Sequence, residues 1–320
     1  PEGMAQAAEY LGKAIELDAD YALAYSSLGQ LHCFRFIGST DRHDLEIAIE
    51  NLDRAVELDP ELADPYGWLS YAYARERRYE EAIAHGRRAI EAEADNPQSH
   101  YFLAVALWLR GMDEYDTSGY QEALDHLRQV TLLAPRYQPG YQIQGVILLQ
   151  AGQYSMARER LEVAAQIEES GDFDLGRFVG AIGGLARVAF RQGHLEEAAN
   201  LLDKAFEVSG ETVHVYTPAC NAMTHCWKGD LLMRGRQRQE ALQAFRAAQE
   251  QVFESPRSMG IGWPLVRSHL GLAHSFHRLR MRREAEASYE KAVTMLEAKA
   301  PYDFSGLWDS GDAEILMEMA

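Results

Sequence analysis

The side chains best suited to chemistry gather in one stretch, HVYTPACNAMTHCWKG, which supplies two histidines and two cysteines. They are His214, Cys220, His225 and Cys226. Imidazole and thiolate groups bind Zn²⁺, but structural zinc sites favour two ligand pairs at short spacing. Here five residues separate Cys220 from Cys226, and adjacent helical residues point about 100° apart. We therefore expect these side chains to pack in a core or line a surface, with a metal site as the weaker alternative.

A second group of histidines, His269, His274 and His277, lies further along the chain. His274 and His277 share one face of a helix, but the sequence offers no evident third ligand. The sequence therefore predicts no metal and no cofactor at either group.

Glycines and paired carboxylates are the remaining candidates for chemistry. The glycines of GAIGGLARVAF (180–190) follow no predicted strand, so we expect them to allow close helix packing rather than to bind phosphate. The pairs Glu80–Glu81 and Glu196–Glu197 begin predicted helices, where negative charge suits the positive end of the helix dipole. The sequence contains no phosphate-binding P-loop, GxSxG or HExxH motif. It predicts a protein that is not an enzyme.

The elements that carry these residues repeat along the chain. One alanine of YEEAIAHGRRAIEAEAD recurs at the same place in eight similar stretches, as Ala7, Ala48, Ala82, Ala123, Ala157, Ala198, Ala241 and Ala285. These anchor alanines are 41, 34, 41, 34, 41, 43 and 44 residues apart, so the period is 34 with additions. Seven extra residues make about two helical turns, which either lie in a loop or lengthen both helices of a pair by one turn.

Apolar residues at fixed distances from the anchor alanines define one helical face. A larger apolar residue follows most anchors by four positions, and a small or β-branched residue follows each by seven. Residues at these spacings share a face with the anchor. The small residues let a neighbouring helix approach closely, and the large residue fills the gap beside them. Because one hairpin cannot bury such a face alone, the hairpins are expected to stack.

This pattern resembles the tetratricopeptide-repeat family over about nine-tenths of the chain. The resemblance implies an all-α, right-handed superhelical solenoid of about seven full repeats and one half repeat. The full repeats are expected at 22–62, 63–96, 97–137, 138–171, 179–212, 222–255 and 266–299. The array is similar to those attached to bacterial signalling and regulatory proteins.

Four regions follow from these repeats. Residues 1–21 form a half repeat or capping helix, 22–171 carry an aromatic and apolar groove, and 172–299 form longer repeats with an arginine-bearing groove. Residues 300–320 hold five acidic residues and no basic one, and Asp312 is a candidate N-cap of a short helix. This segment either caps the solenoid or binds a surface of this chain or of a partner.

The resemblance also implies that the first helix of each pair lines a concave face. Positions carried over from the family predict a partner-binding groove made of Tyr71, Tyr101, Val105, Trp108, Leu149, Arg187, Arg191, Arg234, Arg267, His274 and Arg278. Exposed aromatic and apolar side chains serve as anchors, and arginine captures carboxylates. The predicted ligand is a peptide segment with apolar anchors and acidic residues. The alternatives are that the chain itself covers the apolar part and that local acids pair with the arginines.

The composition of the chain excludes some classes of partner. The net charge of −18 and an isoelectric point of about 5.0 argue against nucleic acid and anionic membranes as partners. Three cysteines and the lack of a long apolar run or signal peptide predict a cytoplasmic protein. We therefore expect a non-catalytic scaffold or adaptor that binds a protein partner. The alternative is a sensor module that binds a small peptide or metabolite and signals to a partner or fused domain, and self-association stays open.

Overall fold

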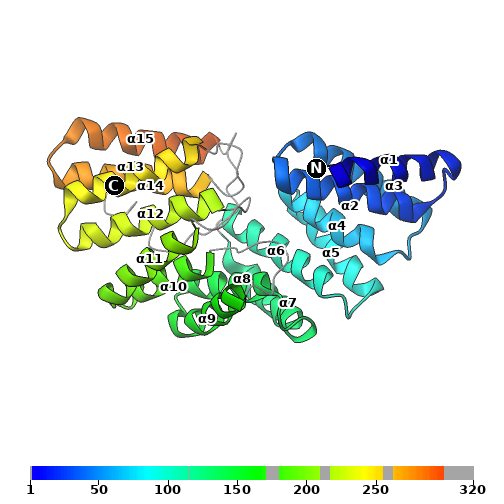
Figure 1. Cartoon of the computed structure of the whole chain (residues 1–320), viewed down its shortest axis with the longest axis horizontal. Coiled ribbons are helices and arrows are strands. Elements are labelled where there is room, and N and C mark those ends of the chain that lie inside the picture. The colour runs from blue at the N-terminus through cyan, green and yellow to red at the C-terminus, as the bar shows by residue number, and fades with distance from the viewer. Residues whose placement is uncertain (1, 115, 171–179, 210–216, 255–261, 299–320) are drawn as a thin grey trace. The chain divides into compact units, whose positions relative to one another are not determined.

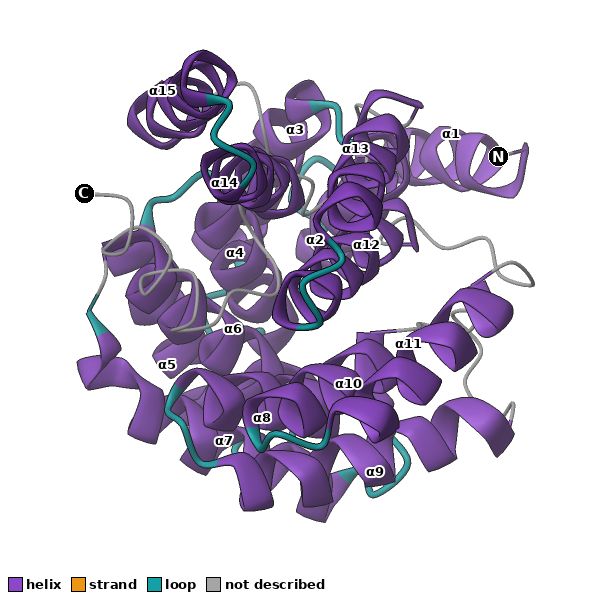
Figure 2. Cartoon of the chain, turned by 90° about the vertical axis from the view of Figure 1, so that its left-hand side faces the viewer, coloured by secondary structure: helices purple, strands orange, loops and turns teal. Residues whose placement is uncertain are grey.

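The computed structural model describes residues 2–114, 116–170, 180–209, 217–254 and 262–298. Across these residues the chain forms fifteen α-helices and one short 3₁₀ turn, and no strand occurs among them (Figure 2). The predicted all-α fold is confirmed.

The helices form seven pairs after one single helix (Figure 1). The single helix is α1 (Glu2–Leu17), and the pairs are α2 (Ala22–Ser39) with α3 (Arg42–Leu58), α4 (Ala63–Arg75) with α5 (Tyr79–Ala92), α6 (Pro97–Glu114) with α7 (Tyr120–Leu133), α8 (Gln138–Gln150) with α9 (Tyr154–Ser170), α10 (Gly180–Arg191) with α11 (Leu195–Ser209), α12 (Thr217–Arg234) with α13 (Arg238–Glu254), and α14 (Gly262–Arg278) with α15 (Arg282–Ala298). A 3₁₀ turn (Thr117–Gly119) precedes α7. The predicted half repeat and seven full repeats are thus present as helices.

The chain divides into two compact units, Pro1–Gly140 and Tyr141–Ala320. In the first unit α2 contacts α4, and α4 contacts α6. In the second unit α10 contacts α12, and α12 contacts α14. We call each of these sets the first-helix layer of its unit. The second helices α3, α5, α11 and α13 each pack on their own first helix and on the next one, so the hairpins of each unit are stacked in series as predicted.

The predicted apolar face forms the contact between the stacked helices. Seven of the eight anchor alanines are buried, and the residues seven positions later are buried in the same helices at Ala55, Ala89, Val130, Ala164, Ala205, Ala248 and Ala292. Ala7 of α1 is only partly buried. The anchor pattern therefore identified the packing face of the second helices correctly.

In the hairpin α2–α3 the added residues lengthen both helices. The hairpin α2–α3 has helices of 18 and 17 residues, whereas α4–α5, which follows the basic period, has helices of 13 and 14. Two predicted repeat starts, 222 and 266, fall too late, because α12 begins at Thr217 and α14 at Gly262. Pro218 and Pro264 lie in the first turns of these helices, where a missing amide hydrogen breaks no helical hydrogen bond.

The turns inside six of the hairpins contain a residue with positive φ, which in the α2–α3 turn is Thr40 with a φ of 55°. Glycine supplies it at Gly152 and Gly193, where φ is 72° and 84°. Arg77, Arg236 and Arg280 hold the corresponding place with φ between 61° and 63°. This left-handed conformation is strained for a residue with a Cβ atom, so these arginine turns are less favourable locally than the glycine turns.

Among the described helices, none is long and apolar enough to cross a membrane. His214, the acidic segment 300–320 and the expected helix at Asp312 lie outside the described residues.

Candidate functional site

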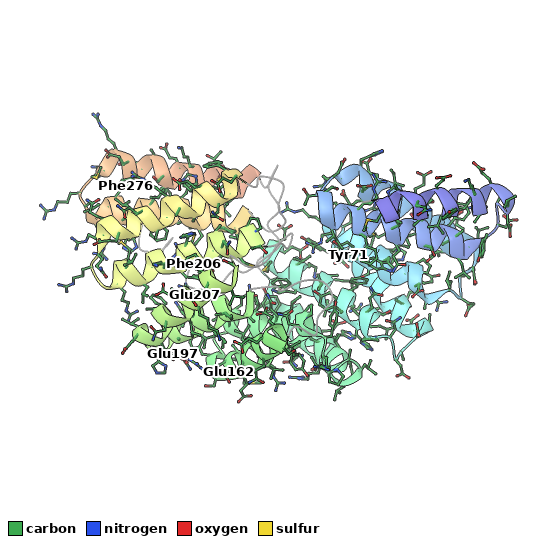
Figure 3. All side chains as sticks on the ribbon, viewed as in Figure 1. Tyr71, Glu162, Glu197, Phe206, Glu207 and Phe276 are labelled. Carbon is green, nitrogen blue, oxygen red and sulfur yellow. The ribbon has the colours of Figure 1, made fainter. Side chains whose placement is uncertain are left out.

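Aromatic side chains run across the first-helix layer of the first unit. Phe34 of α2 lies edge-on to Trp68 of α4 with ring centroids 5.0 Å apart, and Trp68 lies 4.9 Å from Phe102 of α6. Tyr71, labelled in Figure 3, lies 5.4 Å from Phe102. Trp68, Tyr71 and Phe102 are buried, while Phe34 keeps 38% of its surface exposed. These rings join three consecutive repeats through apolar contact.

The same layer is balanced in charge. Helices α2, α4 and α6 carry three basic residues, Arg35, Arg75 and Arg110, and three acidic residues, Asp64, Asp113 and Glu114. A layer of this kind has no net preference for a charged ligand.

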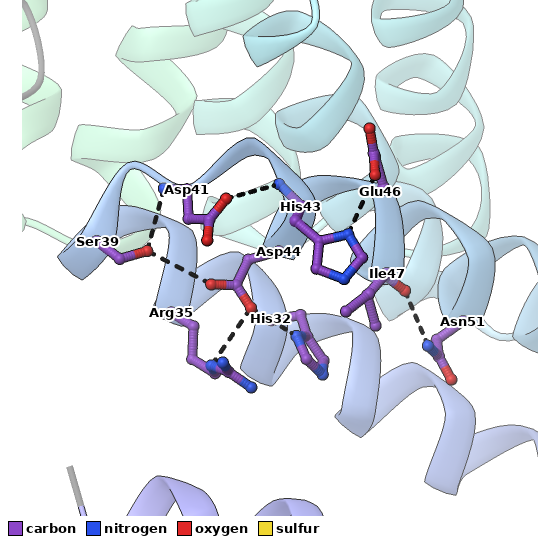
Figure 4. Close-up of polar contacts among 9 residues, drawn as sticks. All are labelled: His32, Arg35, Ser39, Asp41, His43, Asp44, Glu46, Ile47 and Asn51. Atoms are coloured by element: carbon purple, nitrogen blue, oxygen red, sulfur yellow. Dashed lines mark hydrogen bonds and ion pairs between the residues drawn. The ribbon is translucent and has the colours of Figure 1, made fainter. Parts of the chain in front are cut away.

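A buried carboxylate, Asp44, ties α2 to α3 within one hairpin (Figure 4). Its Oδ1 lies 2.9 Å from Nδ1 of His32 and 3.3 Å from Nε of Arg35. Ser39 donates a hydrogen bond to its Oδ2 at 3.4 Å. Because the Arg35 side chain is 47% exposed, water shares in the solvation of this network.

The first-helix layer of the second unit is strongly basic. Helices α10, α12 and α14 carry six basic residues, Arg187, Arg191, Lys228, Arg234, Arg267 and Arg278, and one acidic residue, Asp230. The paired second helices α11, α13 and α15 carry eleven acidic and six basic residues. Positive charge is therefore concentrated on one layer of a chain whose net charge is −18.

Asp230 joins three repeats at the centre of this basic layer. Nη1 of Arg187 on α10 donates to Oδ2 of Asp230 at 2.9 Å, and Nη2 of Arg267 on α14 donates to Oδ1. The two arginines are 2% and 1% exposed. Each carboxylate oxygen receives one guanidinium, so the pair is charge-assisted on both sides and fixes the three helices against one another.

Three further arginines of this layer lie in the last turn of their helices, where a cation favours the negative end of the helix dipole. Arg234 and Arg278 are exposed, and Arg191 is partly buried beside the Tyr154 hydroxyl at 3.1 Å. The guanidinium of Arg234 lies 5.8 Å from the ring centroid of Phe190. That ring also receives Arg187 at 5.1 Å, so an arginine-aromatic cluster forms on α10 and α12.

The structure places the predicted site residues in two groups. It buries Tyr71, Val105, Trp108, Leu149, Arg187 and Arg267. It leaves Tyr101, Arg191, Arg234, His274 and Arg278 partly or fully exposed. Direct contact with a partner stays a prediction for the second group. The first group was expected to lie on an open surface, and this expectation is corrected. The position of a residue in its helix decides that it lies on the first-helix layer, but side chains of neighbouring helices decide whether it is exposed.

Three of the histidine and cysteine candidates, His225, Cys226 and His269, lie in packed surroundings. Cys226 is fully buried with its thiol 3.5 Å from the carbonyl of Pro264, and the ring of His225 lies 4.5 Å from that of Phe206. Burial, with a smaller contribution from Lys228, lowers the pKa of His225 to about 4. His269 lies 3.0 Å from Nε2 of Gln249, and burial lowers its pKa to about 4 as well. Among the described residues, no group of three or more His, Cys, Asp or Glu side chains could hold a metal ion.

The glycines of α10 allow close packing, as predicted. A Cβ atom on Gly183 would lie 2.8 Å from Cζ3 of Trp227, and one on Gly184 would lie 3.0 Å from Cδ1 of Leu161. The distance at Gly183 is too short for a Cβ atom, and the one at Gly184 would require Leu161 to shift, so both glycines let α10 approach its neighbours closely.

Sequence reasoning missed Trp68 and Phe102 of the aromatic layer. Phe190 of the arginine-aromatic cluster stands at a position carried over from the family but was not among the predicted site residues. A signal existed for the first two, because Phe34, Trp68 and Phe102 are spaced by the basic period of 34 residues. The carried-over positions did not include the two later residues. Repeat position placed Phe190 on the layer, but only the structure shows its contact with two arginines.

Comparison with known proteins shows similarity to repeat proteins in parts of the chain. The family model described as a tetratricopeptide repeat matches residues 41–97 and 184–258. Tetratricopeptide repeat protein 16 of Mus musculus is 30% identical over 95 residues, which cover 30% of this chain and 12% of the mouse protein. The chain thus spans a small part of that relative's length. The two matched stretches lie one in each unit, and the predicted resemblance to tetratricopeptide-repeat proteins is confirmed.

Two solved structures show the same fold along most of the chain. A tetratricopeptide repeat protein from Parabacteroides merdae has a TM-score of 0.60 at 16% identity, covering 92% of this chain and 97% of that one. A chain of the APC/C hetero-tetramer Cut9–Hcn1 has a TM-score of 0.58 at 13% identity, covering 90% of this chain and 49% of that one. At these identities the likeness concerns the fold alone. It supports the α-solenoid of tetratricopeptide repeats.

Proposed function

We propose that this protein is an interaction scaffold or adaptor that binds an acidic peptide segment of a protein partner on the first-helix layer of its second unit. The observation that carries the proposal is the ratio of six basic residues to one acidic residue on α10, α12 and α14. Tetratricopeptide repeats generally act as scaffolds for protein interaction and present an extended surface for it.

The chemistry of the layer supports an anionic ligand. Guanidinium groups present planar donors that match carboxylates and stack on aromatic rings. Arg234 and Arg278 are exposed enough to meet an incoming carboxylate, and Phe190 offers an apolar contact beside Arg234. Arg187 and Arg267 are held by Asp230 and add positive potential from within the layer.

The rest of the chain supports selectivity for this layer. Because the second helices α11, α13 and α15 carry more acidic than basic residues, they repel an acidic peptide. Binding that depends on this contrast weakens as salt screens the charges. All three cysteines are free and buried, so we also propose a reducing compartment, the cytoplasm, for this protein.

A peptide titration tests the proposal. The probe is a fluorescent peptide of about 20 residues with five Asp or Glu side chains, and its control is the same peptide with Asn and Gln in their place. We expect the acidic peptide to bind and the control to bind at least about tenfold more weakly, with affinity falling as salt rises.

Matched variants locate the binding. Arg234→Glu with Arg278→Glu reverses two exposed charges on the first-helix layer, and we expect it to raise the Kd at least about tenfold. Arg238→Glu with Arg283→Glu makes the same charge change at exposed positions of α13 and α15. Equal losses for both variants would contradict the proposal. Stabilisation by a screened metabolite, with no effect of the peptide, would favour the sensor alternative.

A further inference from the structure

We propose that the acidic C-terminal segment, residues 299–320, is itself an occupant of the basic first-helix layer and competes there with the partner peptide. The inference rests on the proposed function, because both use the same arginines. It names a regulator that the chain carries within its own sequence.

Charge complementarity is the first argument. The segment carries five acidic residues, Asp303, Asp309, Asp312, Glu314 and Glu318, and one basic residue, Lys299. Among the described helices of the second unit, α10, α12 and α14 together carry an excess of positive charge, whereas α9, α11, α13 and α15 each carry more acidic than basic residues. Electrostatics therefore directs the segment to α10, α12 and α14 rather than to the second helices.

The place where the segment begins is the second argument. Only residues 279–281 separate α14 from α15, and the two 17-residue helices pack against each other as a hairpin. The end of α15 at Ala298 therefore lies beside the start of α14, near Arg267. The segment leaves the fold at one end of the basic layer.

The length of the segment is sufficient. Helix α14 is about 25 Å long at 1.5 Å per residue, whereas 22 extended residues reach about 70 Å. Asp303 can thus reach the level of Arg267, and Asp309 and Asp312 can reach Arg278 and Arg234 at the far ends of α14 and α12.

The apolar residues of the segment also have a place on this layer. Phe304, Leu307 and Trp308 stand between the first acidic residue and the others. Phe190 is only partly buried and is flanked by two guanidinium groups, and Met233 beside Arg234 is partly buried too. Aromatic rings bind favourably against such arginine-aromatic surfaces.

The consequence is competition within one molecule. A short tether holds its end at an effective concentration on the order of millimolar, so a partner peptide must displace the segment before it binds. The apparent affinity for the partner falls by the fraction of molecules whose layer is free.

Hydrogen exchange on the full chain tests docking of the segment. We expect residues 299–320 to exchange more slowly in the wild type than in Arg234→Glu with Arg278→Glu, by about fivefold or more. The matched Arg238→Glu with Arg283→Glu variant is expected to exchange like the wild type. Adding Asp309→Arg and Asp312→Arg to the first variant reverses the charges on both sides and is expected to restore protection. Equal exchange in all four proteins overturns the inference.

A second measurement separates the inference from the proposed function. In the full chain, Asp303→Asn, Asp309→Asn and Asp312→Asn together are expected to tighten binding of the acidic probe peptide about tenfold, since the competitor is weakened. If the probe depends on Arg234 and Arg278 while exchange of the segment does not, the proposed function stands and the inference fails. If neither depends on them, both fail. Protection that grows between about 1 and about 100 μM chain would assign the occupant to a second copy and overturn the intramolecular form.

Discussion

The two first-helix layers are built from the same repeat but differ in their side chains: one is aromatic and balanced in charge, and the other is strongly basic. In the first unit α2, α4 and α6 are joined by aromatic rings and hold as many acidic as basic residues. In the second unit α10, α12 and α14 hold six basic residues around one aspartate. The helix positions that pack are alike, since all the anchor alanines except Ala7 are buried in both units. The repeat therefore fixes the packing and leaves the layer free to differ in chemistry.

The buried carboxylates show the same contrast. Asp44 lies within one hairpin, where His32 and the half-exposed Arg35 are its partners. Asp230 lies between three hairpins and receives two guanidinium groups that are almost fully buried. Removing the Asp44 carboxylate is therefore expected to disturb one repeat, whereas removing that of Asp230 is expected to disturb the alignment of three.

The largest expected effect is on the aromatic layer. Trp68→Ala removes a buried indole that contacts Phe34 and Phe102, and we expect a loss of about 4 kcal/mol in the free energy of unfolding. Hydrogen exchange should increase in α2, α4 and α6 and stay unchanged in α10, α12 and α14. Trp227→Ala, at a buried tryptophan of α12, is the matched change and should reverse the pattern. Equal acceleration in both units for either variant would show that they unfold as one, against this prediction.

The buried carboxylates give the next largest effect. Asp230→Asn leaves two buried guanidinium groups without their shared charge, and we expect it to lower the free energy of unfolding by about 3 kcal/mol. Asp44→Asn should cost about 1 kcal/mol, because Arg35 reaches water. Urea denaturation followed by circular dichroism measures both. A cost for Asp44→Asn equal to or above that for Asp230→Asn would contradict the ranking.

Much of this fold follows from the sequence, because one helical face recurs in phase. The anchor alanines and their partners at seven positions identified the second helices and their buried side. The exposure of individual side chains on the first-helix layers could not be predicted from the repeat pattern. Position in the repeat places Tyr71 and Arg267 on the first-helix layer, but side chains from neighbouring repeats decide that both are buried.

The role of Asp230 could not be predicted from the sequence either. Its partners lie 43 residues before it and 37 residues after it, distances that approach the repeat spacing but differ from each other. A single sequence shows three charged residues on three helices. Only the stacking of those helices brings both guanidinium groups to one carboxylate, so a pairwise pattern within one repeat could not reveal it.

The smallest expected effects come from substituting two arginines that lie two residues apart, Arg278 and Arg280. Arg278 ends α14 on the basic layer, and Arg280 lies in the following turn with a φ of 63°. Arg280→Gly should raise the free energy of unfolding by about 0.5–1 kcal/mol, because glycine adopts positive φ without strain. Arg278→Ala should instead lower it slightly by removing a cation from the helix end, and should weaken binding of the acidic peptide about threefold.

Both changes remove one positive charge, so charge alone predicts equal losses in binding. Urea denaturation and peptide anisotropy on the two variants decide between charge and position. If Arg280→Gly weakens the peptide as much as Arg278→Ala does, the second unit attracts acidic ligands through its general field, and its first-helix layer is no more a binding surface than that of the first unit.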